Sequence, residues 1–134
     1  MITYAIEPDL SASEFLSLLA ASTLAERRPV DQPQRIAKML ANSDLIVTAR
    51  DTAGHLVGVA RSVTDFSYCL YCSDLAVDAR VQGRGIGKAL LRETVKAAPE
   101  VKTHLLLSAP GAMSFYEAAG YEMVENCFIF HRGD

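Results

Sequence analysis

The chain has 134 residues, of which 50% are hydrophobic and 22% are charged, and its formal net charge at neutral pH is −3. This length suffices for one domain with a single sizeable core, and the composition excludes a disordered or low-complexity chain. Because the charge balance is acidic and no apolar run is long enough to cross a bilayer, we expect one cytoplasmic domain over residues 1–134, with neither nucleic acid nor a membrane as its partner.

The first 42 residues predict one strand followed by two helices. Residues 2–7 form the strand, which ends at Pro8, and Ser11 or Ser13 then caps the first helix. A polar break separates this helix from a second one over about residues 34–42, where apolar side chains recur on one face. After this helix the pattern changes from a helical period to an extended one.

Three extended runs in the middle of the chain predict antiparallel strands. They are residues 45–49, 56–63 and 68–77. The first two are joined by a short loop, Asp51–Gly54, whose glycine is typical of a hairpin turn. Cys69 and Cys72 in the third run are three residues apart and therefore point to opposite faces of a strand. We interpret them as buried packing residues and expect no metal site.

The last part of the chain predicts helices that alternate with strands. In order, these are a helix over about residues 86–98, a strand over 103–107, a helix opened by Ala109–Gly111 and ended by Gly120, and strands over 121–124 and 127–130. A strand, a helix and a strand joined at this spacing usually give a parallel pair. The whole order, β-α-α-β-β-β-α-β-α-β-β, predicts an α/β (α+β) fold with a mixed sheet of about seven strands and about four helices.

The glycine loop, residues 82–88, joins a strand to the following helix. Gly83, Gly85 and Gly87 alternate with Arg84 and Ile86, so several backbone N–H groups at the helix start are free to face an anion. Cations repeat at helical spacing along one side of the same helix, at Arg84, Lys88, Arg92 and Lys96. The loop therefore predicts a phosphate site.

Two other phosphate-binding loops are excluded by their spacing. A P-loop needs four residues between its glycines and a hydroxyl after the lysine, whereas Gly83 and Gly87 enclose three residues and Ala89 follows Lys88. A dinucleotide fingerprint would need a glycine where Lys88 stands. A glycine-rich turn with exposed cations and no ligand stays open as an alternative.

The pattern Gln82-x-x-Gly85-x-Gly87 instead resembles the acyl-CoA pyrophosphate loop of the GNAT superfamily of N-acyltransferases. A second motif supports this independently, since residues 112–121 are similar to the family's Ala-x-x-Phe-Tyr-x-x-x-Gly-Phe signature. Three earlier segments, residues 27–29, 42–45 and 56–61, are similar to a small-GNAT subgroup that includes plant plastid serotonin and lysine acetyltransferases and bacterial relatives. The two motifs together extend the resemblance over residues 68–121.

The resemblance implies a sheet that opens near Val77 into a V-shaped cleft between the fourth and fifth strands, where acetyl-CoA lies. Backbone groups of Leu75, Ala76 and Val77 would pair with its pantetheine arm. The other residues that the resemblance assigns to this cosubstrate form the glycine loop: Gln82, Gly83, Arg84, Gly85, Ile86, Gly87 and Lys88. The implied reaction uses no metal.

The resemblance also implies the catalytic groups. Tyr116 would protonate the departing CoA thiolate as general acid, and the Val77 N–H would stabilise the tetrahedral oxyanion. The glutamate that several members carry on the fourth strand has no counterpart here. We therefore take Asp74, the nearest carboxylate on that strand, as the base, while Glu26, Asp65 or a water relay stay open as alternatives.

The predicted function is N-acetyl transfer from acetyl-CoA to a primary amine by direct attack in a ternary complex. The amine belongs either to a small molecule or to a protein lysine or N-terminus, and the fold does not decide between them. A non-catalytic acyl-CoA-binding module, or a regulatory member of the family, is the alternative. The apolar run at residues 127–130 could pair across a homodimer.

Overall fold

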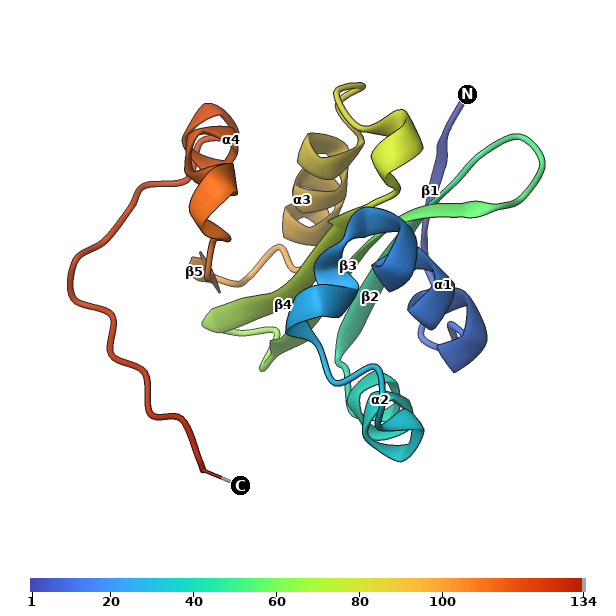
Figure 1. Cartoon of the computed structure of the whole chain (residues 1–134). Helices are drawn as coiled ribbons and strands as arrows, with labels where there is room; N and C mark the ends of the chain where they lie inside the picture. The colour runs from blue at the N-terminus through green and yellow to red at the C-terminus, as the bar shows by residue number, and fades with distance from the viewer. Residues whose placement is uncertain (134) are drawn as a thin grey trace.

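A computed structural model describes residues 1–133 and arranges them around one mixed sheet of five strands (Figure 1). The strands lie in the sheet in chain order, and the first four pair antiparallel while the fifth joins the fourth in parallel. Their bounds are Thr3–Ile6 (β1), Leu45–Arg50 (β2), Leu56–Thr64 (β3), Cys69–Val77 (β4) and Thr103–Leu106 (β5).

Four α-helices and three short 3₁₀-helices complete the described part of the chain. They are Ala12–Ser22 (α1), Leu24–Arg27 (η1), Pro33–Ala41 (α2), Ala79–Val81 (η2), Ile86–Ala97 (α3), Pro110–Ala112 (η3) and Met113–Ala118 (α4). Local chemistry sets their ends. The Ser11 hydroxyl accepts the Glu14 N–H at the start of α1, and Pro33 lies in the first turn of α2. Gly120 follows α4 in the left-handed conformation that the sequence predicted.

The core lies on both faces of the sheet because successive side chains of the central strands alternate in direction. Leu45 and Val47 of β2 belong to the cluster that packs against α3. Ile46, between them, belongs to the opposite cluster with Phe15 of α1 and Ile36 of α2. Figure 1 shows the same two layers, with α3 behind the sheet and α1 in front of it. The helices therefore cover both faces of the central strands.

Strands β4 and β5 stay paired over only four residue positions. Their ladder runs from Cys69 opposite Thr103 to Cys72 opposite Leu106 and then stops. Strand β4 continues with only β3 beside it, so the edge of residues 73–77 that faces away from β3 has no strand partner in the described chain. The split expected between the fourth and fifth strands is present, and it begins after Cys72 rather than near Val77.

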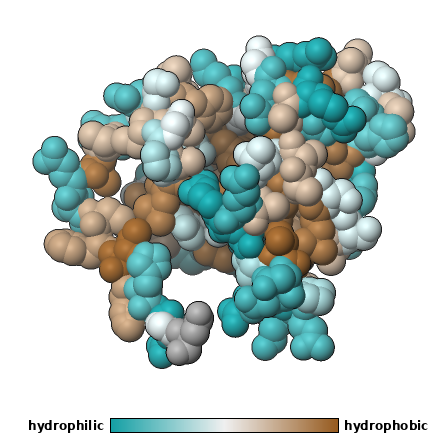
Figure 2. All heavy atoms as spheres, in the orientation of Figure 1, coloured by the Kyte–Doolittle hydropathy of each residue, from teal (hydrophilic) through white to brown (hydrophobic). Residues whose placement is uncertain are grey.

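The two closing strands predicted at residues 121–124 and 127–130 are wrong, since the sheet has five strands and not about seven. After α4 the chain runs on in an extended path without pairing (Figure 1). Its apolar side chains lie on the surface at the lower left of Figure 2, and Phe128 is 95% exposed. A short apolar run forms a strand only where a neighbouring strand supplies hydrogen bonds, and in the described chain none does so here.

Candidate active site

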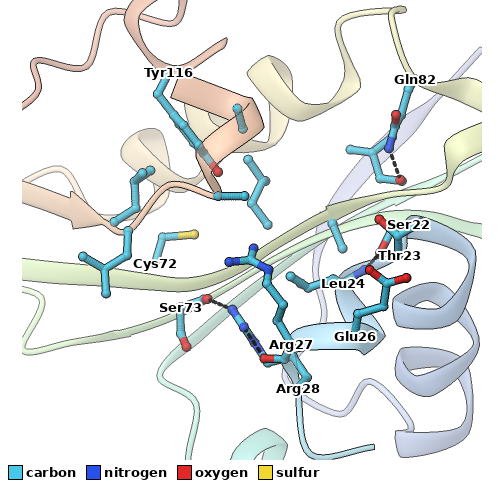
Figure 3. Close-up of a pocket in the computed structure, with 17 residues that line it drawn as sticks. Ser22, Thr23, Leu24, Glu26, Arg27, Arg28, Cys72, Ser73, Gln82 and Tyr116 are labelled. Carbon is cyan, nitrogen blue, oxygen red and sulfur yellow. Dashed lines mark hydrogen bonds between the residues drawn. The ribbon is translucent and has the colours of Figure 1, made fainter. Parts of the chain in front are cut away.

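A cavity of about 230 Å³ lies at the split between β4 and β5. Its walls come from the end of α1, from η1, from the second half of β4, from Gln82, from the chain after β5 and from α4. Figure 3 shows Tyr116 and Arg27 pointing into this space from opposite walls. The split in the sheet thus gathers polar groups from segments far apart in the sequence.

The open edge of β4 directs backbone groups into the cavity. The Asp78 N–H donates to a carbonyl of β3 at 2.9 Å. Because the N–H groups of successive strand residues point to opposite edges, the Val77 N–H faces the open side. The Val77 carbonyl also faces this open side, where it accepts a hydrogen bond from the Gln82 side-chain amide at 3.1 Å. Leu75, Ala76 and Val77 all line the cavity, so the three predicted backbone residues share one wall.

The first backbone N–H groups of α3 donate no hydrogen bond to a capping side chain. Gly85 is the N-cap residue, and no side chain accepts a hydrogen bond from this helix start. The first turn of α3 also contains no acidic residue. Free N–H groups at the positive end of a helix attract an anion, which suits the phosphate site that the sequence predicts.

The three glycines of the glycine loop have different structural roles. Gly83 and Gly85 both have φ angles of 81°, a conformation that is strained for a residue with a Cβ atom. Gly87 has no such angle, but a Cβ atom there would lie 3.0 Å from the Cζ atom of Phe115. Gly87 therefore permits close packing of α3 against the Phe115 ring, a reason that the sequence did not reveal.

Tyr116 lies on α4 and points its hydroxyl into the cavity (Figure 3). Phe115 and Tyr121 contact its ring edge-on, at centroid distances of 5.1 and 6.3 Å. Burial raises the pKa of the Tyr116 hydroxyl to about 12, and the positive charge of Arg27 opposes part of this rise. The phenol is therefore neutral at physiological pH and can donate its proton.

Asp74, taken from the sequence as the base, is buried between two arginines. Its Oδ1 atom accepts a hydrogen bond from Nε of Arg28 at 2.5 Å, and its Oδ2 atom accepts one from Nε of Arg61. The exposed fraction of the side chain is 0% for Asp74, 22% for Arg28 and 8% for Arg61. Asp74 is not among the residues that line the cavity. These contacts argue against Asp74 as the base, because both of its oxygens are engaged behind the cavity wall.

The other two carboxylates that the sequence left open as bases differ in position. Glu26 lines the cavity and Asp65 does not. The Oδ1 atom of Asp65 accepts the backbone N–H groups of Tyr68, Ser67 and Cys69, and these hydrogen bonds lower the pKa of its carboxyl group. Asp65 therefore stabilises a turn, and Glu26 is the carboxylate that a bound acceptor would meet.

Two further residues of the cavity were not predicted to lie there. Arg27 belongs to a segment that resembles the small-GNAT subgroup, but no role was predicted for it, because an arginine in a polar break is typical of a charged surface. Cys72 is buried as predicted, but its side chain faces the cavity, whereas Cys69 is exposed and not buried. Burial raises the pKa of the Cys72 thiol to about 11, so this group is protonated at neutral pH.

Metal ligands are not grouped anywhere in residues 1–133, where no three His, Cys, Asp or Glu side chains are placed to hold an ion. Cys69, Cys72 and Cys127 are all free of disulfide bonds. None of the helices in the described chain has the length and apolar character needed to cross a bilayer.

The sequence matches the family model of the acetyltransferase (GNAT) domain along residues 41–123. It is 25% identical over 122 residues to the uncharacterized N-acetyltransferase ycf52 of Pyropia yezoensis, covering 84% of this chain and 68% of that protein. The protein of the same name from Porphyra purpurea is 29% identical over 98 residues, which cover 69% of this chain and 56% of the relative. The chain thus spans between half and about two thirds of the length of these relatives.

The fold is shared with solved structures. The GNAT-family acetyltransferase SP0256 from Streptococcus pneumoniae matches with a TM-score of 0.75 and 23% identity, covering 99% of this chain and 100% of that one. At this identity the likeness shows the fold alone. It agrees with the mixed sheet and the four α-helices described above.

Proposed function

Given that this chain belongs to the acetyltransferase (GNAT) family of acyltransferases, we propose that its cosubstrate is acetyl-CoA and its acceptor a primary amine. The observation that carries this proposal is the open edge of β4, residues 73–77, which faces the same cavity as the Tyr116 hydroxyl. A thioester bound along this edge would have its carbonyl beside a main-chain donor and its sulfur beside a phenol.

The proposed donor site has two parts. The pantetheine arm would pair with the backbone groups on the open edge of β4, those of Leu75 and the Val77 N–H, since Ala76 between them turns its backbone groups toward β3. The diphosphate would lie against the free N–H groups at the start of α3. The side chains of Arg84 and Lys88 are exposed beside this helix start and would add attraction that salt screens. The backbone is therefore expected to determine most of the affinity for the donor.

Replacing Gly85 by alanine should weaken acetyl-CoA binding about tenfold. Alanine disfavours the left-handed conformation of this residue by about 1–2 kcal/mol, so the loop would relax and the N–H groups of α3 would turn away from the diphosphate. Isothermal titration calorimetry with acetyl-CoA would measure the change.

Gly54→Ala is the matched control for this variant. Gly54 has a φ angle of 85° in the β2–β3 hairpin, and at both glycines a Cβ atom would meet nothing within 4 Å. The two variants should therefore lose similar amounts of stability, while only Gly85→Ala loses affinity. Equal acetyl-CoA affinity in both variants would show that the conformation of the loop does not matter to the donor.

The proposed transfer is a direct attack. The neutral amine nitrogen attacks the thioester carbonyl carbon, a C–N bond forms and the C–S bond breaks, with the Val77 N–H stabilising the oxyanion between these events. The departing sulfur takes the Tyr116 proton, and the nitrogen proton passes to Glu26 directly or through water. Solvent then returns a proton to Tyr116. The raised pKa of the Cys72 thiol disfavours a covalent acyl-enzyme, because a thiol is a poor nucleophile.

The pH dependence of turnover follows from the pKa of Tyr116. Because burial raises this pKa to about 12, the acid form persists far above neutral pH. Loss of the Tyr116 proton should therefore cause no decline of kcat between roughly pH 7 and pH 10. A decline within this range that is present in the wild type and absent in Tyr116→Phe would contradict the assignment.

The buried ion pairs of Asp74 favour a second candidate, a non-catalytic acyl-CoA-binding module, because they leave β4 without an accessible base. Incubation with acetyl-CoA and a panel of primary amines, with free thiol monitored, separates the two functions. The acyltransferase should release CoA with at least one amine, and mass spectrometry should find that amine acetylated. A pure binding module would release no CoA above background with any amine.

A further inference from the structure

The side chain of Arg27 supplies an unmatched positive charge in the cavity. It projects from η1 toward Tyr116 (Figure 3), and within residues 1–133 no hydrogen bond or ion pair engages its guanidinium group. The neighbouring Arg28 differs, because its guanidinium donates to Asp74 and to the Ser73 carbonyl. The two adjacent arginines therefore have separate roles: Arg28 is bound to the β4 wall, and Arg27 extends into the cavity.

The charges around the cavity do not cancel. Among residues 1–133, the cavity lining holds Glu26, Arg27 and Arg28 as its charged groups, and Asp74 and Arg61 form an ion pair behind the β4 wall, so three guanidinium groups stand against two carboxylates. Asp74 is already shared between two of these arginines, so one positive charge is in excess. An acceptor with only amino groups would bring further positive charge, whereas an acceptor with a carboxylate would balance it.

We propose that the acceptor is a free amino acid, whose carboxylate is bound by the Arg27 guanidinium while its amine lies toward Glu26. Arginine suits this task because its planar fork of N–H donors matches a carboxylate in geometry and charge. Glu26 and Arg27 are adjacent on η1 and both line the cavity, so they offer opposite charges to the two ends of a zwitterion.

This inference rests on the proposed acetyl transfer and is tested with acceptor pairs that differ only in the carboxylate. Suitable pairs are phenylalanine with phenethylamine and lysine with 1,5-diaminopentane, assayed by free thiol release from acetyl-CoA. We expect kcat/KM to be about tenfold or more higher for the amino acid of each pair, the size of one charge-assisted hydrogen bond. In Arg27→Gln the ratio should fall close to one, mainly through KM, and Arg27→Lys should restore part of it.

Arg35→Gln is the matched control for these variants. Arg35 is exposed on α2, and its guanidinium donates to Gln32 outside the cavity. This variant removes one surface charge and should leave the preference within each pair as it is in the wild type. A loss of preference in Arg35→Gln equal to that in Arg27→Gln would reduce the effect to net charge and overturn the role of Arg27.

The outcomes of these assays distinguish a failure of the amino-acid inference from a failure of the proposed acetyl transfer. If amines are acetylated without preference for the carboxylate, or if Arg27→Gln slows both members of each pair equally, the amino-acid assignment is overturned and the acetyl transfer stands. If no acceptor is acetylated, the transfer itself fails. In that case, lysine and phenylalanine are titrated into the CoA-loaded protein by calorimetry. The inference requires that they bind to the wild type and not to Arg27→Gln, and a wild type that binds neither amino acid would overturn it.

Discussion

Tyr116→Phe should lower turnover about a hundredfold, the usual scale for removing a general acid, while acetyl-CoA affinity stays nearly unchanged. The hydroxyl points into the cavity and is kept protonated by burial, so in the proposed mechanism its removal would deprive the departing thiolate of a proton. The ring keeps its edge-on contacts with Phe115 and Tyr121, because phenylalanine has the same aromatic shape. The loss should therefore fall on kcat.

Steady-state kinetics at saturating substrate and calorimetry with acetyl-CoA measure the two quantities. Tyr121→Phe is the matched control, since it removes a neighbouring half-buried hydroxyl that does not line the cavity. It should keep nearly full turnover. Equal kcat in wild type and Tyr116→Phe would remove Tyr116 from the chemistry, and a parallel loss of acetyl-CoA affinity would assign it to binding.

Asp74→Asn should destabilise the fold by about 3–5 kcal/mol, because it leaves two guanidinium groups without their shared countercharge. Most of this cost should come from Arg61, whose side chain is 8% exposed, since Arg28 is better hydrated at 22%. Arg61 keeps only its bonds to Ser43 Oγ at 3.1 Å and to a backbone carbonyl of α2. Urea denaturation followed by circular dichroism measures the free energy of unfolding.

Asp31→Asn serves as the control for Asp74→Asn. Asp31 is an exposed carboxylate in the turn before α2, so its loss should change the free energy of unfolding by less than about 0.5 kcal/mol. If Asp74→Asn had the same free energy of unfolding as this control, the ion pairs of Asp74 would not stabilise the fold. A variant that is stable but inactive would return Asp74 to the role of base.

Most of the sheet could be predicted because its signals are local. The extended run at residues 45–49, the glycine hairpin at residues 51–54 and the Ser11 cap act over a few residues each, and the structure follows them to within one or two positions. The closing strands at residues 121–124 and 127–130 could not be predicted reliably, because a strand exists only with a partner edge. Whether β5 offers its edge depends on where the chain goes after α4.

In the candidate site, too, the features set by local sequence could be predicted and those set by distant contacts could not. The glycine loop could be predicted, since Gly83 and Gly85 satisfy a local need for positive φ angles. The state of Asp74 could not, because its partners Arg28 and Arg61 lie 46 and 13 residues away and reach it only through the fold. Arg27 was missed for a related reason, as only the placement of η1 opposite α4 brings it near Tyr116.

Calorimetric titration of the wild-type protein with acetyl-CoA bears most directly on the function proposed for the β4 edge and the start of α3. Material with native circular dichroism should bind one molecule of acetyl-CoA per chain, and Gly85→Ala should bind it more weakly than Gly54→Ala. A well-folded sample that takes up neither acetyl-CoA nor CoA would contradict the donor site, and with it the transfer built upon that site.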